Sequence, residues 1–456
     1  MATLDSINPF DGQIVGTVDI TPVEEIPGIV ARAGIAQPAW AALGMEGRAA
    51  VLGKAGGDLR KKAQELAALI TREMGKPIRE SMGEVRGLGA GLEAELREIS
   101  EALAPETLES GGLTSVIHRD PLGVCAAITP WNFPMAMPHW MVLPALAAGN
   151  TVVFKPSEET PLSGQAYADI LGEYLPADVL ITIQGADEQG RTLVESAVDL
   201  IAFTGSRDVG KEILRSAGGD LKRVILELGG KDAMIVLEDA DLREAARFAA
   251  FNGFRNAGQV CVSTERILVH DGVADAFLDL LVREAEELVA GNGLDKRTTL
   301  GPMVNPGQRQ HVIQQIREAV MAGATVMAGA TVMNGDIRHG DPFILPTVLA
   351  DVPEELSIST DETFGPVVCV NRVSCDDEAV AKANATPFGL GAVVFGGDPA
   401  RTHHVARRLT AGMVGINRGC AGAPGTPWVG ARESGYGFHK GRDGHRQFTQ
   451  TRVVTR

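Results

Sequence analysis

Two kinds of hydrophobic pattern follow each other along this chain. Between residues 26 and 103 apolar side chains recur at helical spacing, with breaks near Gly44 and at Gly75-Lys76-Pro77, which predicts several amphipathic helices. From residue 124 the pattern changes to short, continuous apolar runs separated by helical stretches. These runs are 124–128, 151–154, 179–183 and 200–203. Their order predicts an α/β fold in which helices cover both faces of a parallel sheet.

A second α/β segment begins near Leu226. Asp241-Leu242-Arg243-Glu244 has the form of a capping box and predicts a helix that runs towards Phe254. Another helix is expected at about 273–289. The sequence AGATVM occurs twice within 322–333, which we interpret as the end of a helix followed by a strand. A chain of 456 residues with two such segments is expected to form two or three domains.

Other segments favour β-structure outside these runs. Residues 8–17 predict a hairpin with Asp11-Gly12 as its turn. Residues 107–119 predict an exposed β segment, and residues 448–455 a last strand. Gly87–Gly91 superficially suggests a dinucleotide loop, but no strand precedes it, so close helix packing is the preferred interpretation.

The composition excludes several classes of protein. A net charge of −16 argues against nucleic acid or an anionic membrane surface as the main partner. Five scattered cysteines without a CxxC pair predict neither a disulfide framework nor a zinc site, and we expect no metal. Prolines interrupt the one long apolar tract, Phe133–Gly149, which makes it a poor membrane span. The first residues lack the pattern of a secretion signal, which favours a cytoplasmic protein.

Cys261 is the strongest candidate for chemistry. It lies in FNGFRNAGQVCVSTER, between a helical pattern and a β-rich segment at 265–270, and the flexible residues 256–258 precede it. A thiol presented to a cavity in this way suits a nucleophile, since cysteine needs only a modest shift towards the thiolate. The alternative is a small buried hydrophobic residue. We expect the other four cysteines in the core.

Four other motifs place polar residues beside apolar runs. The amide of Asn132, in ITPWNFP at a strand end, could donate to a developing oxyanion. Lys155 and Glu158, in VFKPSE, could bind the hydroxyl groups of a ribose, or could form a solvated ion pair. The helix after FTGSRDVG would turn its first amides towards a pyrophosphate. Glu227, in LELGGK, lies among apolar residues and is expected to be partly protonated or poised as a base.

Taken in this order with Cys261, these motifs resemble those of the aldehyde dehydrogenase superfamily from Asn8 to Val454. Further matching segments are 301–304, 343–349, 362–367 and 415–417. The resemblance implies an α/β aldehyde dehydrogenase fold with three parts. They are a Rossmann-like cofactor domain (1–104 and 121–228), an α/β catalytic domain (229–433) and a β-arm for oligomerisation (105–120 and 434–456). A partner's sheet would cover the open edges of the arm, so we expect a homodimer or homotetramer.

The resemblance also implies how the protein acts on a small-molecule aldehyde. Cys261 is the nucleophile that attacks the aldehyde, and Asn132 and the Cys261 backbone N–H hold the oxyanion. Hydride transfer to a nicotinamide then leaves a thioester on Cys261. Glu227 activates the water that hydrolyses this thioester and frees the carboxylic acid.

Cofactor contacts are implied in the same way. The residues are Thr129, Trp131, Lys155, Ser157, Glu158, Gly205, Ser206, Leu228, Glu362 and Phe364. Lys155 and Glu158 fall on the adenine ribose, Gly205 and Ser206 on the pyrophosphate, and Glu362 on the nicotinamide ribose. The Glu158 carboxylate would repel the extra phosphate of NADP, so NAD is the expected cofactor and NADP the less favoured one.

Two departures from the family pattern concern proton transfer and the substrate. A glutamate that many relatives carry near the C-terminus is His439 here, which could shuttle protons or lie on the surface. An arginine that binds the distal carboxylate of succinate semialdehyde in some relatives is Trp140 here, which favours an apolar or aromatic aldehyde. His139 and Arg255 remain nearby candidates for that role. The tail, 437–447, resembles some semialdehyde-oxidising relatives, so a semialdehyde such as succinate semialdehyde stays open.

Two rival functions remain. A CoA-acylating aldehyde dehydrogenase would pass the thioester to CoA, but such relatives typically lack a base at the position of Glu227. A non-catalytic NAD-binding protein on the same fold would be expected to lack Cys261, Asn132 or Glu227, and all three are present.

Overall fold

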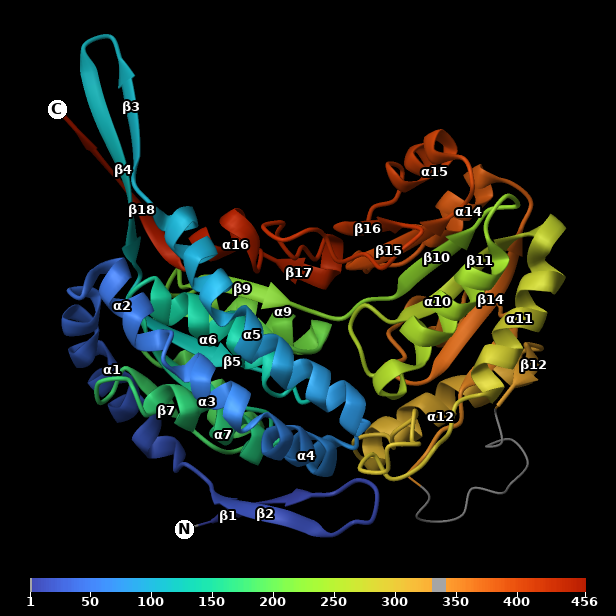
Figure 1. The fold of residues 1–456 in the computed structure, drawn as a ribbon, viewed down its shortest axis with the longest axis horizontal. Helices are drawn as coiled ribbons and strands as arrows, with labels where there is room; N and C mark the ends of the chain where they lie inside the picture. Colours follow the sequence, from blue (N-terminus) through green and yellow to red (C-terminus); the bar gives the residue numbers. More distant parts are fainter. Residues whose placement is uncertain (1, 330–341) are drawn as a thin grey trace.

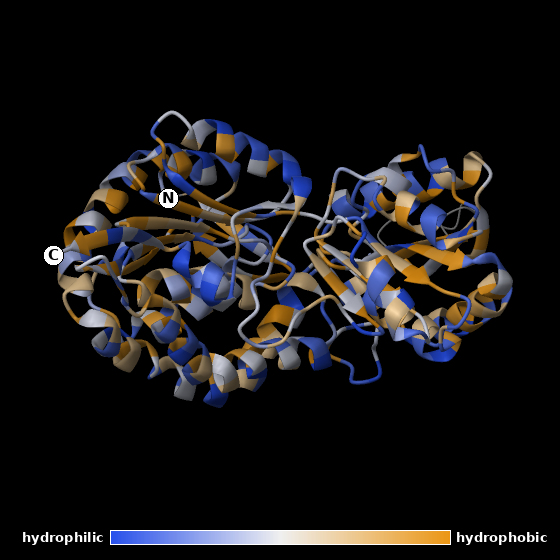
Figure 2. Cartoon of the chain, turned by 90° about the horizontal axis from the view of Figure 1, so that it is seen from above, coloured by the Kyte–Doolittle hydropathy of each residue, from blue (hydrophilic) through white to orange (hydrophobic). Residues whose placement is uncertain are grey.

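The computed structural model describes residues 2–329 and 342–456. Two α/β units stand side by side, each built around its own sheet, and a narrow β-arm projects from the first (Figure 1). The strands of both sheets are predominantly hydrophobic, while the outer faces of the helices carry most of the polar residues (Figure 2). The chain therefore has a separate core around each sheet.

The first unit begins with a hairpin and a group of helices. β1 (Thr3–Ile7) and β2 (Ile14–Asp19) pair in antiparallel fashion, and Gly12 in their turn has a φ of 72°. The helices that follow are α1 (Ile26–Ala41), α2 (Gly44–Leu52), α3 (Ala55–Lys61), α4 (Ala63–Met74) and α5 (Ile78–Leu103). The predicted break near Gly44 is confirmed, because α1 ends at Ala41 and α2 begins at Gly44. The break at Gly75-Lys76-Pro77 is confirmed as well, because Gly75, with a φ of 85°, caps α4 and Pro77 precedes α5.

The first sheet has the strand order β17-β9-β8-β5-β6-β7. Its strands are β5 (Val124–Ile128), β6 (Thr151–Lys155), β7 (Leu180–Thr182), β8 (Leu200–Thr204), β9 (Arg223–Glu227) and the antiparallel β17 (Gly435–Tyr436). The connecting helices are α6 (Ala136–Ala147), α7 (Pro161–Gly172), α8 (Asp187–Glu195) and α9 (Arg207–Ala217). After β5 the chain builds outwards through β6 and β7, and then returns to build the other side through β8 and β9. The sheet therefore has a topological switch point between β5 and β8.

Successive residues of β5 face two different cores. Cys125 and Ala127 pack with α3–α7, whereas Val124, Ala126 and Ile128 pack with α1, α8 and α9. Both faces of the strand are buried, which explains why its sequence is a continuous apolar run instead of an alternating one.

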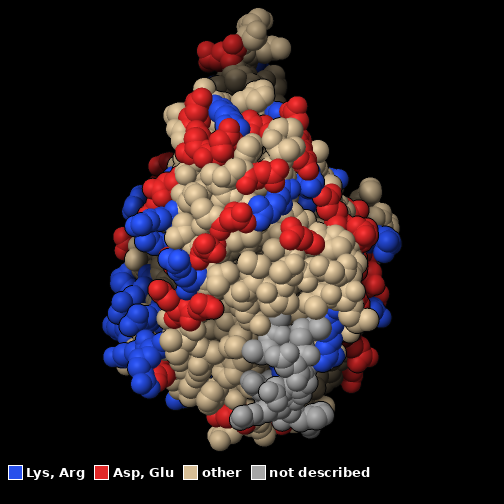
Figure 3. Space-filling view, turned by 90° about the vertical axis from the view of Figure 1, so that its right-hand side faces the viewer, with Lys and Arg blue, Asp and Glu red and all other residues tan. Residues whose placement is uncertain are grey.

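The second unit holds a sheet of order β12-β13-β14-β11-β10-β15-β16, parallel except for β12. Its strands are β10 (Asp232–Val236), β11 (Thr264–His270), β12 (Thr325–Ala328), β13 (Thr347–Ala350), β14 (Val367–Val373), β15 (Gly391–Phe395) and β16 (Met413–Ile416). The helices are α10 (Leu242–Phe254), α11 (Ala274–Glu286), α12 (Pro306–Met321), α13 (Ser357–Thr360), α14 (Asp376–Ala383) and α15 (Pro399–Ala406). Asp241 caps α10 as predicted, because its carboxylate accepts hydrogen bonds from the amides of Arg243 and Glu244. On the face of the molecule in Figure 3, acidic and basic side chains surround a broad area of uncharged residues.

The arm consists of β3 (Glu106–Ser110), β4 (Leu113–Pro121) and the C-terminal strand β18 (Thr449–Thr455), which follows α16 (Gly441–Arg446). Gly111 and Gly112 form the turn between β3 and β4, both with positive φ. Leu108, Leu113 and Val453 are exposed on it. Exposed apolar side chains on open strands fit the predicted oligomerisation arm, although the homodimer or homotetramer stays a prediction.

Most predicted elements are confirmed, with two qualifications. Within Gly87–Gly91, which lies in α5, only Gly89 is closely packed, because a Cβ there would come within 3.0 Å of Arg60. The first copy of the AGATVM repeat, residues 322–327, forms the turn directly after α12 and most of β12, whereas residues 330–333 of the second copy lie outside the described residues. Across 2–329 and 342–456, no helix is long and apolar enough to cross a membrane.

Candidate active site

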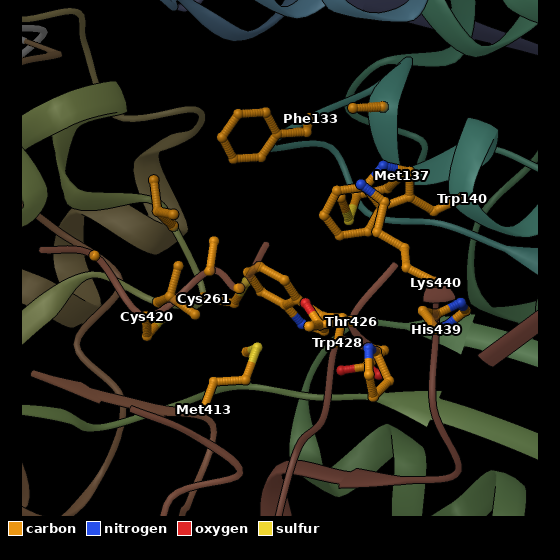
Figure 4. A pocket seen from close by; sticks show the side chains of 18 of the residues that line it. Phe133, Met137, Trp140, Cys261, Met413, Cys420, Thr426, Trp428, His439 and Lys440 are labelled. Atoms are coloured by element: carbon orange, nitrogen blue, oxygen red, sulfur yellow. The ribbon is translucent and has the colours of Figure 1, made fainter. Parts of the chain in front are cut away.

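A cavity of about 940 Å³ lies between the two units. Cys261, Cys420 and Met413 line one side, whereas Phe133, Met137, Trp140 and Lys440 line another (Figure 4). Glu227 and Leu228, at the end of β9, also line it. The structure therefore brings the predicted nucleophile and the predicted base into one cavity.

The backbone before Cys261 is strained. In the short helical turn η2 (Arg255–Gly258), Asn256 and Ala257 have φ values of 50° and 55°, which non-glycine residues adopt only at a cost of about 1–3 kcal/mol each. Gly258 follows with a φ of 70°, and a Cβ there would come within 2.0 Å of the Gly365 carbonyl oxygen. The Asn256 N–H donates to Glu80 Oε2 at 3.0 Å. Contacts with α5 and with the 362–367 segment thus hold the loop in a shape that presents the thiol to the cavity.

The buried side chain of Gln259 holds this loop in place through hydrogen bonds, a role that we did not predict from the sequence. Its side chain is completely buried, donates to the Asn256 carbonyl at 3.0 Å and accepts from the Val304 N–H at 2.9 Å. Its backbone carbonyl accepts from the side-chain amides of Asn132 at 3.0 Å and Asn256 at 3.2 Å. One residue therefore connects the cysteine loop, the end of β5 and the 301–304 motif.

Replacing Gln259 with leucine is expected to lower the free energy of unfolding by about 1–3 kcal/mol, because it leaves the Val304 N–H buried without its acceptor and removes one of the two hydrogen bonds to the Asn256 carbonyl. Chemical denaturation followed by circular dichroism measures this change. Gln314→Leu is the control, since Gln314 pairs with Glu318 on the surface, and it should change stability by less than about 0.5 kcal/mol. Equal stability of the two variants would contradict the role of Gln259.

Asn132, the predicted oxyanion residue, is not itself in the cavity lining, but its neighbour Phe133 is, and Asn132 bonds to the loop that carries Cys261. The Asn132 side-chain amide is buried and uses one of its two hydrogens on the Gln259 carbonyl, so the other remains free. Within the described chain, the Cys261 N–H has no hydrogen-bond acceptor. The second N–H of the Asn132 side chain and the backbone N–H of Cys261 are therefore both without an acceptor among the described residues, as donors to a ligand oxygen would be.

The cavity favours the uncharged forms of its acidic groups. Burial raises the pKa of the Cys261 thiol well above its usual value, and the carboxylates of Glu362, Asp232 and Glu227 raise it further, while Arg255 opposes them. Burial also raises the pKa of Glu227 well above its usual range, against a smaller opposing effect of Trp428. Neither oxygen of Glu227 has a hydrogen bond of good geometry from any residue in the described ranges. This carboxyl group is therefore free to exchange a proton with a ligand or with water.

We expected the other four cysteines in the core, but only two of them are buried there. Cys125 and Cys369 are buried, but Cys375 is exposed and Cys420 lines the cavity. Cys375 directly precedes α14 at the surface, which the apolar pattern of its neighbours did not indicate. Among the cysteines, only Cys261 combines access to the cavity with the strained loop.

The predicted cofactor residues gather at the carboxyl ends of the strands around the switch point. Thr129 follows β5, Lys155 ends β6 and Ser206 follows β8 as the N-cap of α9. Thr129 Oγ1 is buried and has no partner among the described residues, and Lys155 Nζ lies 3.5 Å from Glu158 Oε2. A helix N-terminus, a buried hydroxyl and a lysine–glutamate pair at this edge fit the phosphates and ribose of a dinucleotide.

The remaining predicted contacts are nearby. Glu362 Oε1 accepts from the Gly230 N–H at 3.1 Å, and burial and Glu265 raise its pKa to about 8. Trp131 meets Phe364 edge to face, with ring centroids 5.4 Å apart. Ser157 Oγ accepts from the Glu159 N–H, whereas the Leu228 N–H already donates to the Ser434 carbonyl. Leu228 can therefore contact a ligand through its side chain but not through its amide.

A buried ion pair, which we did not predict, positions Glu362 and Phe364. Lys231 Nζ lies 2.5 Å from Glu265 Oε2 and 2.9 Å from Thr363 Oγ1. Glu265 in turn accepts from the backbone amides of Thr363 and Phe364. Glu265 lies 34 residues after Lys231, and nothing in the local pattern distinguishes either from an ordinary surface charge. Only the pairing of β10 with β11 brings them together.

For each of two histidines the structure excludes one of the alternatives that the sequence left open. His439 is not a surface residue: it is 1% exposed, lines the cavity, and burial lowers its pKa to about 3. His139 is not free to bind a substrate carboxylate, because it is buried and held by Tyr167 and Glu95 at 3.1 Å each. Arg255 and Trp140 do line the cavity.

Comparisons with known proteins agree with this geometry. The model of the aldehyde dehydrogenase family matches residues 1–454. The chain is 37% identical to a betaine aldehyde dehydrogenase of Sinorhizobium fredii, covering 99% of this chain and 93% of the relative. It is 36% identical to a glutarate-semialdehyde dehydrogenase of Pseudomonas putida, covering 99% and 94%.

A solved structure of an indole-3-acetaldehyde dehydrogenase in complex with NAD⁺ superposes with a TM-score of 0.95 at 34% identity, covering 100% of this chain and 93% of that one. The match spans both units, the arm and the segments that build the cavity. On its sequence and on its fold, the chain belongs to the aldehyde dehydrogenase family.

Proposed function

We propose that this protein oxidises an aldehyde to its carboxylic acid with NAD, through a covalent intermediate on Cys261. The observation that carries this proposal is that Cys261, with an unpaired backbone N–H, and the unpaired carboxyl group of Glu227 line the same cavity. A nucleophile, an oxyanion site and a base are the groups that oxidation followed by hydrolysis requires.

In the first half of the reaction, Cys261 Sγ attacks the aldehyde carbon and forms a thiohemiacetal. Because burial favours the protonated thiol, its proton must leave as the sulfur attacks, and Glu227 in its ionised form is the group in the cavity that accepts it. The Asn132 amide and the Cys261 N–H stabilise the oxyanion. Loss of hydride from the tetrahedral carbon, for which the bound cofactor supplies the acceptor, leaves a thioester on Cys261.

Before the second half, Glu227 passes the thiol proton to solvent. It then removes a proton from water as that water attacks the thioester, the adduct breaks down to the carboxylic acid and the Cys261 thiolate, and Glu227 returns its proton to the thiolate. A carboxyl group with a raised pKa suits these transfers, because it is a stronger base than an ordinary glutamate and can still release its proton.

NAD is the cofactor that the residues at the switch point fit. Thr129, Lys155, Glu158, Gly205 and Ser206 would hold its adenosine and phosphates. Trp131, Ser157, Leu228, Glu362 and Phe364 would hold the rest. Glu158, which is partly exposed at the end of β6, would accept hydrogen bonds from ribose hydroxyls and repel a phosphate there. The NAD⁺ complex of the indole-3-acetaldehyde dehydrogenase supports this choice.

The assembly we propose is a cytoplasmic homodimer or homotetramer, divided into the three domains predicted from the sequence. Its arm would pair with another copy through the exposed edge of β3 or β18. The substrates named for relatives, betaine aldehyde and glutarate semialdehyde, leave the aldehyde itself open.

Turnover of an aldehyde panel with NAD, with NADP, and with and without CoA tests the proposed function. We expect NADH to form without CoA, and kcat/KM to be at least about tenfold higher with NAD than with NADP, because of the charge of Glu158. Formation of NADH only when CoA is present would instead indicate an acylating enzyme. No NADH under either condition would favour a binding protein.

A further inference from the structure

Two cations in the cavity have no anionic partner within the described chain. Lys440 and Arg255 both line it, and neither takes part in an ion pair or a side-chain hydrogen bond. Lys440 Nζ lies 4.0 Å from the ring centroid of Trp140, and the Arg255 guanidinium lies 5.7 Å from that of Phe251. Aromatic faces therefore hold both charges, which leaves them available to a ligand.

Apart from Glu227, whose pKa burial raises, the acidic side chains that line the same cavity already have hydrogen-bond partners. Glu84 pairs with Lys76 at 2.5 Å, Glu95 with His139 at 3.1 Å and Glu98 with His445 at 3.0 Å. Glu80 accepts from the Asn256 N–H. Glu95 is near enough for Lys440 to lower its pKa, but the two do not come within the 4.0 Å of an ion pair. Lys440 and Arg255 are therefore the basic side chains of the cavity lining that keep a charge without a bonded partner among the described residues.

The two cations lie in different parts of the cavity. Arg255 belongs to η2, beside the thiol, and its charge acts directly on the pKa of Cys261. Lys440 comes from the C-terminal segment and lies beside Trp140, on another side of the cavity from Cys261 (Figure 4). Trp140 and Trp428, with ring centroids 5.3 Å apart, form an aromatic wall next to Lys440. A substrate whose aldehyde carbon reaches Cys261 would therefore extend along aromatic rings towards Lys440.

A second polar group accompanies Lys440. The ring of His439 is buried and lines the cavity, and among residues 2–329 and 342–456 neither of its nitrogens has a hydrogen bond of good geometry, although the Trp140 backbone is near enough to raise its pKa against the larger effect of burial. Burial of an imidazole that lacks well-formed hydrogen bonds is unfavourable in free energy unless a ligand or water supplies them. The ammonium group of Lys440 and the ring N–H of His439 could therefore both donate a hydrogen bond to a ligand at this end of the cavity.

We propose that the substrate is an aldehyde that carries a carboxylate at its other end, and that Lys440 is the residue that selects it by pairing with this carboxylate. This inference rests on the proposed function and names its substrate class. His439 adds a hydrogen bond to the same carboxylate. A quaternary ammonium aldehyde is disfavoured, because the face of Trp140 that would attract its charge already carries the ammonium group of Lys440.

Steady-state kinetics with glutarate semialdehyde, pentanal and betaine aldehyde test this assignment, since the first two differ chiefly in the carboxylate. We expect the wild type to prefer glutarate semialdehyde. Lys440→Met should reduce the kcat/KM ratio of glutarate semialdehyde to pentanal roughly 10- to 100-fold, mainly through KM, as expected for a lost charged hydrogen bond. Lys440→Arg keeps the charge and should retain most of the ratio.

The matched control is Lys54→Met, because Lys54 also lies over an aromatic ring, that of Tyr174, but outside the cavity. It should leave the ratio unchanged. An unchanged ratio in Lys440→Met, or a wild-type preference for betaine aldehyde or pentanal, would overturn the assignment while leaving the oxidation itself intact.

Binding of glutarate, the dicarboxylate product, provides a readout that does not depend on turnover. Isothermal titration should show binding to the wild type that Lys440→Met weakens by about tenfold or more. Equal affinity for the two proteins would refute the role of Lys440 even if no aldehyde were oxidised. Loss of turnover with binding retained would count against the proposed function alone.

Discussion

Replacing Cys261 with alanine is expected to reduce NADH formation from any aldehyde by at least ~10⁴-fold. An aldehyde carbon cannot release hydride until a nucleophile makes it tetrahedral, and no other thiol is presented by the strained loop Asn256–Gly258. Cys420 lines the same side of the cavity, but it comes from the turn after β16 and not from the strained loop that precedes Cys261. Spectrophotometry of NADH under saturating aldehyde measures the loss.

Two controls separate chemistry from folding in this experiment. Cys375→Ala removes an exposed thiol far from the cavity and should leave the rate unchanged. The Cys261→Ala protein should unfold within about 1 kcal/mol of the wild type, because a single half-buried sulfur is removed. Residual turnover above about one per cent in a correctly folded variant would show that another group attacks the aldehyde.

The sequence predicted the elements of the fold because burial on both faces makes strands recognisable as continuous apolar runs. Val124–Ile128 is such a run, and its structure is a strand of the same bounds. The ends of these strands could also be located, so the motifs at Asn132, Lys155 and Ser206 fell on one edge of the sheet. A parallel sheet converts positions along the chain into neighbours in space, provided that the strand order is known.

The contacts that support the site could not be predicted in this way. Gln259, and the pair of Lys231 with Glu265, are polar residues whose burial depends on partners far along the chain. Their local patterns are the same as those of surface residues. The position of His439 was left open for the same reason, since its burial depends on contacts with Trp428 and Phe448.

Relatives with two different substrates match this chain almost equally, at 37% and 36% identity, so overall similarity does not select the substrate. The charge of the cavity does discriminate, because a single lysine beside Trp140 changes which end group is attracted. Some relatives that act on succinate semialdehyde carry a carboxylate-binding arginine at the position where this chain has Trp140. Lys440 supplies a cation to the same region from the other end of the sequence, which explains how an aromatic residue at one position and an anionic substrate can be compatible.

Replacing Glu227 with glutamine is expected to convert steady turnover into a single burst of NADH, of about one equivalent per active site. The steady rate after it should be ~10²–10⁴-fold slower than that of the wild type. The thioester still forms if Cys261 can lose its proton to water, but no group remains to activate the hydrolytic water. Rapid-mixing absorbance measures the burst, and mass spectrometry of the quenched protein should locate the acyl group on Cys261.

The pH dependence gives the second part of this test. Burial raises the pKa of Glu227, so in the wild type the base is lost at a higher pH than an ordinary glutamate would be, and the hydrolytic rate should fall as the pH decreases through that value. Glu227→Gln should remove this part of the profile. Glu244→Gln, which changes an exposed carboxylate on α10, should leave both the burst and the profile as in the wild type.

If Glu227→Gln slows the burst itself as much as the steady rate, the carboxylate acts chiefly in deprotonating Cys261. If neither phase changes, another group activates the water, and the raised pKa of Glu227 reflects only its burial beneath the cavity.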